Sequence, residues 1–129
     1  MAIEEVCKAM DWMIEEGYAF YWATSEWPQD DIVQAIEVCK TLKLHKPIAD
    51  QCEYSALVRD NVEKNYRKLF EEYGFGTTVW SPIGRGIISG KYNDGVAPEG
   101  SRFQEDKRPY TQWVWNKFFN ETKKEATIK

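Results

Sequence analysis

The sequence predicts an α/β fold with parallel strands, and three observations support this prediction. Segments with helical periodicity alternate with short apolar segments, in the order helix, strand, helix, strand, helix, strand. The segment at 18–24 is continuously apolar or aromatic, which is typical of a strand covered on both faces. The expected strand ends at Ser25, Gln51 and Ser81 lie 26 and 30 residues apart, which suits one strand–helix unit each.

The elements of the first half follow from local patterns. Apolar residues at three- and four-residue spacing predict a helix at 2–16, and Gly17 suits the position that ends it. The strand at 18–24 comes next. Pro28 then begins a second helix, because proline suits the first turn. Its expected apolar stripe consists of Ile32, Ala35, Ile36, Cys39 and Leu42.

The second half continues the same alternation. We expect a strand at 47–54, although this segment carries charge, and a helix at 61–73 that Gly74 ends. The inward side chains of this helix are expected to be Val62, Tyr66, Leu69, Phe70 and Tyr73. A third strand is predicted at 77–80. Residues 93–111 are expected to form a long loop, and residues 112–126 a final helix.

The composition indicates one folded domain and excludes several classes of protein. The chain has 129 residues, 15% of them aromatic, which is not the composition of a disordered chain. A net charge of −4 without a basic stripe argues against nucleic-acid binding. We find no signal peptide and no membrane-spanning apolar stretch, and therefore expect a cytoplasmic protein without direct membrane insertion. Cys7, Cys39 and Cys52 have no metal-ligand spacing and are expected to be reduced thiols.

The strand ends carry a candidate binding site. Ligands of parallel α/β folds bind at the carboxyl ends of the strands, where this chain has Ser25, Gln51 and Trp80. The hydroxyl and the carboxamide could bind a planar ring that carries an amide, and the indole could stack on it. The alternative is that Gln51 satisfies neighbouring backbone and Trp80 fills the core.

The loop after the third strand carries a candidate phosphate site. It contains Gly84, Gly86 and Gly90, with cations at Arg85 and Lys91, and free backbone N–H groups beside positive charge favour a pyrophosphate. Arg102 is a further candidate cation. The alternative is that these charges are simply solvated.

Other chemistries have weak support. His45 is the only histidine and lies at the end of the fold opposite to the strand carboxyl ends, so it is a poor catalytic base. A Ser–His hydrolase is therefore not expected. Asp50 and Glu53 could form an acid/base pair, but charge satisfaction is the simpler interpretation. We predict no metal site and no catalytic residue in this chain.

Five motifs occur in an order and at intervals that resemble one known family. They are YWATSEW at 21–27, DQCEY at 50–54, WSPI at 80–83, SGKY at 89–92 and GSRF at 100–103. Together they resemble the aldo-keto reductases of the voltage-gated potassium channel β-subunit group. The resemblance implies a partial (β/α)8 TIM barrel of about three βα units over residues 1–103, from helix 4 to strand 7 and its cofactor loop. Residues 104–129 would be a poorly matched, helical C-terminal extension.

The same resemblance implies a cofactor and its contacts. The family binds NADPH and reduces aldehydes and ketones, so Ser25 and Gln51 resemble the residues that hold the nicotinamide carboxamide. Trp80 resembles the residue that stacks on the nicotinamide ring. The start of the loop over the pyrophosphate corresponds to Ser81, Pro82, Ile83 and Gly84, and the phosphate-binding cations to Lys91 and Arg102. Three departures from the family are Glu26, where animal members have arginine although plant-type members resemble this chain, Arg85, where a small residue is usual, and one extra residue between Lys91 and Arg102.

The resemblance also implies partners and an incomplete barrel. Channel-associated members form tetramers beneath a potassium channel, so a homo-oligomer and a channel partner are expected. The family's catalytic tyrosine, lysine and aspartate lie upstream of the segment that matches Ile3. Three parallel strands cannot close a barrel, so we expect this chain to be a fragment, to associate with something that completes the sheet, or to be an aggregation-prone truncated gene product. Alternatives are a non-enzymatic interaction subunit, docking to a channel or a full-length relative, and an unrelated doubly wound domain.

Overall fold

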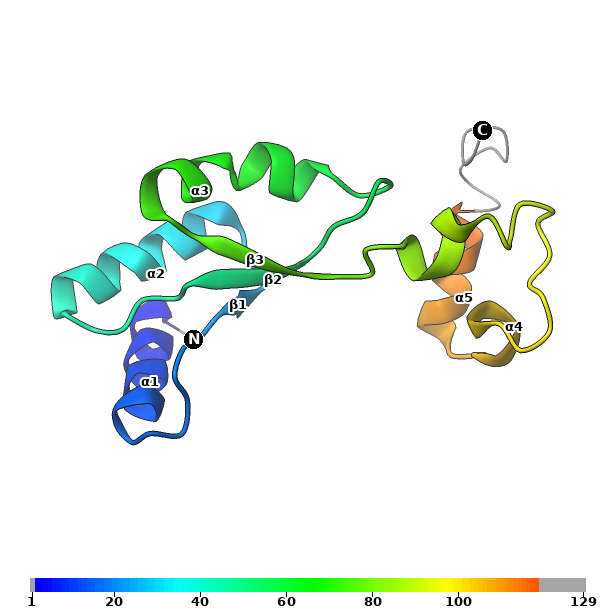
Figure 1. The fold of residues 1–129 in the computed structure, drawn as a ribbon. Helices are drawn as coiled ribbons and strands as arrows, with labels where there is room; N and C mark the ends of the chain where they lie inside the picture. Colours follow the sequence, from blue (N-terminus) through cyan, green and yellow to red (C-terminus); the bar gives the residue numbers. More distant parts are fainter. Residues whose placement is uncertain (1, 119–129) are drawn as a thin grey trace. The chain divides into compact units, whose positions relative to one another are not determined.

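The computed structural model describes residues 2–118, and the chain divides into two compact units. The first unit comprises Met1–Tyr54 and Val58–Trp80, and the second comprises Ser55–Leu57 and Ser81–Lys129. Figure 1 shows that the first unit contains α1, α2 and α3 with the three strands, and that α4 and α5 belong to the second.

Three parallel strands form the sheet of the first unit, in the order β1–β2–β3. Their bounds are Thr24–Ser25 for β1, Ala49–Glu53 for β2 and Gly76–Trp80 for β3. Both pairings are parallel, with Ser25 opposite Gln51 and Gln51 opposite Thr78. The predicted parallel sheet is therefore confirmed, because each strand returns to the same direction through a helical crossover.

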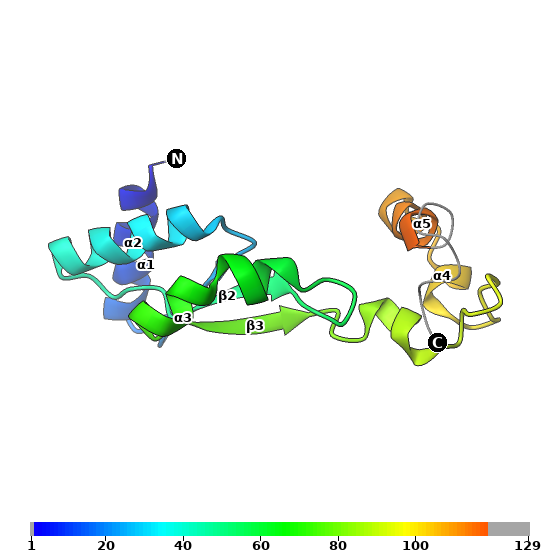
Figure 2. The ribbon, with the colours of Figure 1, turned by 90° about the horizontal axis from the view of Figure 1, so that it is seen from above.

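Two helices cover one face of this sheet. They are α2 (Gln29–Leu42) and α3 (Arg67–Tyr73), and Figures 1 and 2 show both on the same side of the strands. Beneath them lies a buried core of Ile32, Ile36, Cys52, Tyr66, Leu69 and Phe75. The remaining helix, α1 (Ile3–Glu15), packs on α2 through a second buried cluster of Cys7, Trp22, Ala35 and Cys39.

The helix ends follow from the sequence signals. Asp30 and Asp31 lie in the first turn of α2, where the helix dipole favours negative charge. α3 ends at Gly74, whose φ of 60° is the left-handed conformation that glycine adopts without steric cost. The predicted bounds of α1 and the predicted start of α2 agree with the structure to within one residue. The predicted helix at 61–73 is wrong in one respect, because a π-helical turn (Asn61–Asn65) precedes α3 and Tyr66 has non-helical angles.

The predicted strand at 18–24 is wrong. Only Thr24–Ser25 pair as a strand, and Tyr18, Phe20 and Tyr21 are exposed. The pattern rule assumed that both faces are covered, whereas among residues 2–118 the helices α2 and α3 cover one face only. Leu42, which was expected in the apolar stripe of α2, is also exposed.

The second unit has a small core of its own. It contains a 3₁₀ segment (Gly84–Ser89), α4 (Arg102–Glu105) and α5 (Pro109–Asn116), packed around Ile87, Tyr92, Phe103 and Val114. The predicted continuous loop at 93–111 is wrong, because α4 interrupts it and Pro109 starts α5. The predicted final helix at 112–126 corresponds in part to α5, and its end lies outside the described residues.

No helix of residues 2–118 has both the length and the apolar character that a bilayer span requires.

Candidate functional site

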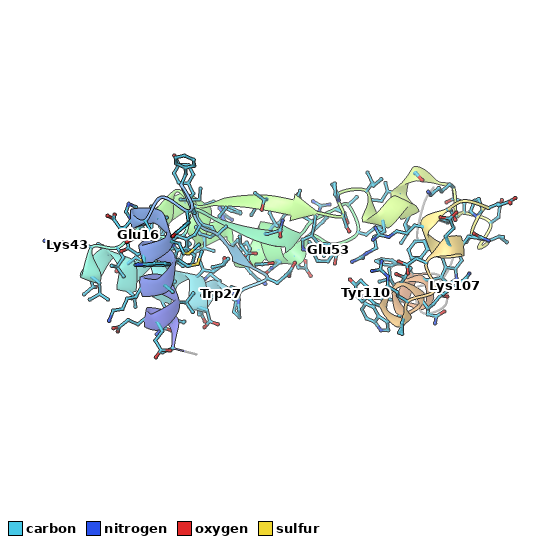
Figure 3. The ribbon with its side chains drawn as sticks, turned by 90° about the horizontal axis from the view of Figure 1, so that it is seen from below. Glu16, Trp27, Lys43, Glu53, Lys107 and Tyr110 are labelled. Atoms are coloured by element: carbon cyan, nitrogen blue, oxygen red, sulfur yellow. The ribbon has the colours of Figure 1, made fainter. Side chains whose placement is uncertain are left out.

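The candidate site lies on the sheet face that α2 and α3 leave open. Side chains alternate along β2, so Asp50 and Cys52 face the helices and are buried, while Gln51 is exposed on the opposite face. The register places Ser25, Gln51 and Thr78 in one row across the three strands. Trp80 lies two residues beyond Thr78 on β3, opposite Glu53. Figure 3 shows Glu53 at the carboxyl ends of the strands.

The structure brings the three predicted ring-binding residues onto this one face. Ser25 and Gln51 are adjacent, and the Ser25 hydroxyl donates to the main-chain carbonyl of Gln51 at 3.1 Å. The Gln51 side-chain amide makes no hydrogen bond within residues 2–118 and is exposed. Trp80 is half-buried. An exposed amide beside an indole is therefore available to a planar ligand that carries donors and acceptors.

Glu26 connects the outer strands at this edge. Its Oε1 accepts from the Trp80 indole N–H at 2.8 Å and from the Glu53 main-chain N–H at 2.6 Å. Glu26 has φ of 55°, an uncommon conformation for a residue other than glycine, and this turn follows β1 directly. In the sequence, Glu26 is notable only as a departure from the family. Nothing in the sequence predicted its left-handed backbone conformation.

Asp50 supports the same edge of the sheet from the face that α2 and α3 cover. It is fully buried and accepts four hydrogen bonds, from Thr24 Oγ1, Glu26 N, Trp27 N and Tyr66 Oη, at 2.6 to 3.3 Å. Burial and the Asp50 charge raise the pKa of Tyr66 above its ordinary value. Asp50 and Glu53 lie on opposite faces of β2, so they form no acid/base pair. The sequence shows the charge of this strand but did not predict that Asp50 is its buried hydrogen-bond acceptor.

The glycine loop belongs to the second unit. The N–H groups of Gly84, Gly86 and Gly90 donate to carbonyl oxygens within the loop, so they are not the free donors that the sequence suggested. Gly86 has φ of 96°, and a Cβ there would lie 3.0 Å from Lys91 Cε. Glycine suits this position because the left-handed conformation strains other residues, and a Cβ would also require the flexible Lys91 side chain to move.

The predicted cations of the loop differ in their surroundings. Arg85, also left-handed at φ 57°, donates to the hydroxyl of Tyr110 on α5, and its guanidinium lies 5.2 Å from the centre of that ring. The Lys91 ammonium lies 5.0 Å from the centre of the Tyr92 ring. Arg102 is exposed and begins α4. The remaining predicted contact residues lie at the start of the loop. Ser81 is half-buried and has φ of 54°. Pro82 and Ile83 are exposed, and Gly84 is buried.

A groove of about 410 Å³ lies elsewhere on the first unit. It is lined by Ile36, Glu37, Lys40, Leu44, Lys46, Glu72 and Tyr73. These residues belong to the ends of α2 and α3 and to the segment that leads into β2, so the groove lies toward the amino ends of the strands. Parallel α/β folds place their chemistry at the other end. We therefore assign the candidate site to the open face and not to this groove.

Comparison with known proteins identifies the family. The model described as "Aldo/keto reductase family" matches residues 1–128. The chain belongs to the aldo/keto reductase family. A putative voltage-gated potassium channel subunit beta of Schizosaccharomyces pombe is 49% identical over 100 residues, which cover 78% of this chain and 29% of that protein. Probable voltage-gated potassium channel beta subunits of Oryza sativa subsp. japonica and Arabidopsis thaliana are 45% and 44% identical over 101 residues, 31% of each relative.

This aldo/keto reductase chain spans about three-tenths of the length of these relatives. Its family and its parallel three-stranded sheet confirm the predicted fold class, a partial (β/α)8 barrel. Within residues 2–118, β1 and β3 each pair on one edge only. An unpaired strand edge presents main-chain donors and acceptors to any chain that can extend the sheet.

Proposed function

We propose that this chain forms the nicotinamide-binding part of an NADPH-dependent aldo-keto reductase that reduces aldehydes and ketones. One observation carries the proposal: Ser25, Gln51 and Trp80 share the open face at the carboxyl ends of three parallel strands. When bound, NADPH would supply the hydride to a carbonyl carbon. Gln51 would pair its exposed carboxamide with that of the nicotinamide, and Trp80 would support the ring.

Two further residues fit this role. Asp50 and Glu26 hold the backbone and the indole that flank Gln51, so the site is ordered before a ligand arrives.

Lys91 and Arg102 of the second unit are the proposed phosphate contacts, because both side chains are exposed cations. Arg85 is proposed as a third phosphate contact, with Tyr110 orienting its guanidinium.

We assign no proton donor to residues 2–118. The tyrosines nearest the strand ends, Tyr54 and Tyr66, donate to the carboxylates of Glu63 and Asp50. Their pKa values are raised, for Tyr54 by the Glu63 hydrogen bond and for Tyr66 by burial and then Asp50. We therefore expect the isolated chain to show no NADPH-dependent reduction of an aldehyde, and measurable turnover would overturn this assignment.

A binding experiment tests the cofactor proposal. Titration of the 129-residue chain with NADP⁺, followed by NMR, should shift the side-chain amide signals of Gln51 and the indole signal of Trp80. Gln51→Ala should weaken binding about tenfold, the equivalent of one or two lost hydrogen bonds. Gln34→Ala, which removes an exposed amide on α2, is the matched control. Unmoved Gln51 and Trp80 signals, or equal affinities of the two variants, would refute the proposal.

A second candidate function is a non-enzymatic subunit that docks to a potassium channel or to a longer relative. The names of the relatives favour it, and so do the two strand edges that lack neighbours. Association with a chain that completes the sheet should protect the main-chain amides of β1 and β3 from hydrogen exchange. A co-expressed channel or relative that leaves these amides unprotected would argue against this candidate.

A further inference from the structure

Three side chains of types that can bind a metal meet at the end of the first unit away from the open-face site. Asp11 and Glu15 lie one turn apart on α1, and His45 lies in the connection between α2 and β2. The His45 Nδ1 is 2.8 Å from Asp11 Oδ1 and 3.6 Å from Glu15 Oε1. One ligand atom of each side chain lies within 4.8 Å of the others. Figure 3 labels Glu16 and Lys43, the residues that directly follow α1 and α2.

The cluster is held in place by the backbone around it. The His45 main-chain N–H donates to Asp11 Oδ1 at 2.8 Å, and the Trp22 indole donates to the His45 carbonyl at 2.7 Å. α1 is fixed on α2 by the buried contact of Cys7 and Cys39. The three side chains therefore come from segments that the core already positions, which lowers the entropy cost of binding an ion.

The charge balance at this place favours a cation. Glu15 and Asp11 lie in the last two turns of α1, where the helix dipole disfavours negative charge, and the last turn holds no basic residue. The only ion-pair partner of these carboxylates within residues 2–118 is His45. The first unit as a whole has fifteen acidic against eight basic residues.

The distances suit a metal better than a second hydrogen bond. At 3.6 Å, Glu15 Oε1 is too far from Nδ1 to accept a hydrogen bond. Ligands about 2.0–2.2 Å from a tetrahedral Zn²⁺ lie roughly 3.3–3.6 Å from one another. The 3.6 Å separation of His45 Nδ1 and Glu15 Oε1 lies at that ligand spacing, whereas the 2.8 Å separation of Nδ1 and Asp11 Oδ1 is a hydrogen bond, which an ion would replace as the Asp11 carboxylate rotates.

We propose that Asp11, Glu15 and His45 bind a divalent transition-metal ion, for which Zn²⁺ is the expected occupant. One imidazole and two carboxylates suit Zn²⁺ and exclude a preference for Mg²⁺ or Ca²⁺, which take oxygen ligands. Three protein ligands leave a position for water. The ion would join the carboxyl end of α1 to the segment that leads into β2. The three thiols take no part, since Cys7, Cys39 and Cys52 are all buried.

The single histidine makes the test direct. Adding Zn²⁺ to the 129-residue chain should shift the imidazole NMR signals, all of which belong to His45, until one equivalent is bound. Mg²⁺ should leave these signals unchanged. Imidazole signals that do not move with Zn²⁺ would overturn the proposal.

Variants of two neighbouring carboxylates, Glu15 and Glu16, distinguish a metal site from an ion pair. Glu15→Gln should weaken Zn²⁺ binding at least about tenfold without disturbing the fold, because Glu15 makes no hydrogen bond within the described residues. His45→Ala should abolish binding. Glu16→Gln removes a neighbouring carboxylate outside the cluster and should bind Zn²⁺ like the unmodified chain. Equal affinities of Glu15→Gln and Glu16→Gln would refute the site, even if His45→Ala fails to fold.

Discussion

Asp50 should be the side chain on which the carboxyl edge of the sheet depends most. We consider Asp50→Ala, which removes the acceptor of four hydrogen bonds. Thr24 Oγ1 and Tyr66 Oη each have another acceptor within reach, the carbonyls of Ala49 and Trp27. Most of the loss of folding stability should therefore come from the main-chain N–H groups of Glu26 and Trp27, which are left without an acceptor.

The magnitude follows from these two donors. A buried donor left without a partner costs about 1–3 kcal/mol. Glu26 is exposed, so its N–H can turn to water, and removing a buried charge also relieves its desolvation. We therefore expect a net loss of about 2–4 kcal/mol. With a urea m-value of about 2 kcal/mol/M, the unfolding midpoint should fall by about 1–2 M.

Urea unfolding followed by far-UV circular dichroism measures this loss. Asp60→Ala is the matched control, because Asp60 is exposed and its pair with Lys64 is worth little. Hydrogen exchange adds a local readout, since the Glu26 and Trp27 amides should lose protection in Asp50→Ala. If this variant is too unstable to study, Asp50→Asn should give a smaller loss at the same amides. Midpoints of Asp50→Ala and Asp60→Ala that agree within about 0.3 M would refute the reasoning.

Three further predictions concern the core, the thiols and the open face. Leu69→Ala should destabilise the chain by about 2–5 kcal/mol and the exposed Leu42→Ala by less than about 1 kcal/mol, measured by urea unfolding. Burial raises the pKa of Cys52 to about 11 and of Cys39 to about 12, so the unfolded thiols ionise first. The thiols should therefore lower stability only as the pH rises above about 8.5; a melting temperature that stays constant from pH 8 to pH 10.5 would contradict this. Glu26→Gln should reduce the preference for NADP⁺ over NADPH several-fold, because the oxidised nicotinamide ring is positive and the Glu26 carboxylate bonds to Trp80. Equal ratios of the two dissociation constants in Glu26→Gln and a Glu37→Gln control would refute it.

Local sequence patterns predicted those helix ends that depend on neighbouring residues. Pro28, Asp30 and Asp31 mark the start of α2, and Gly74 marks the end of α3, because helix ends depend on a few neighbouring groups. The same reasoning failed for 18–24. Continuous apolar character indicates what a segment can bury, and what covers the segment depends on the rest of the fold.

The candidate site was likewise predictable only where its geometry depends on spacing along the chain. Alternation along β2 puts Gln51 on the face opposite Asp50, and strand–helix units of similar length put Ser25 and Gln51 at the same edge of the sheet, where the structure pairs them. The positive φ of Glu26 and the contact of Arg85 with Tyr110 did not follow from spacing. Glutamate and arginine carry no sequence signal for left-handed backbone, and Tyr110 is 25 residues away from Arg85.

The alternation along β2 also links stability to binding. Asp50 and Gln51 are adjacent, so the buried carboxylate fixes the backbone that carries the exposed carboxamide. A ligand that binds Gln51 on the open face acts only on the folded state and should increase protection of the Glu26 and Trp27 amides, which donate to Asp50. In Asp50→Asn, binding to Gln51 should weaken in proportion to the lost protection. Weakened binding with full protection would mean that Asp50 acts on the ligand by its charge and not through the backbone.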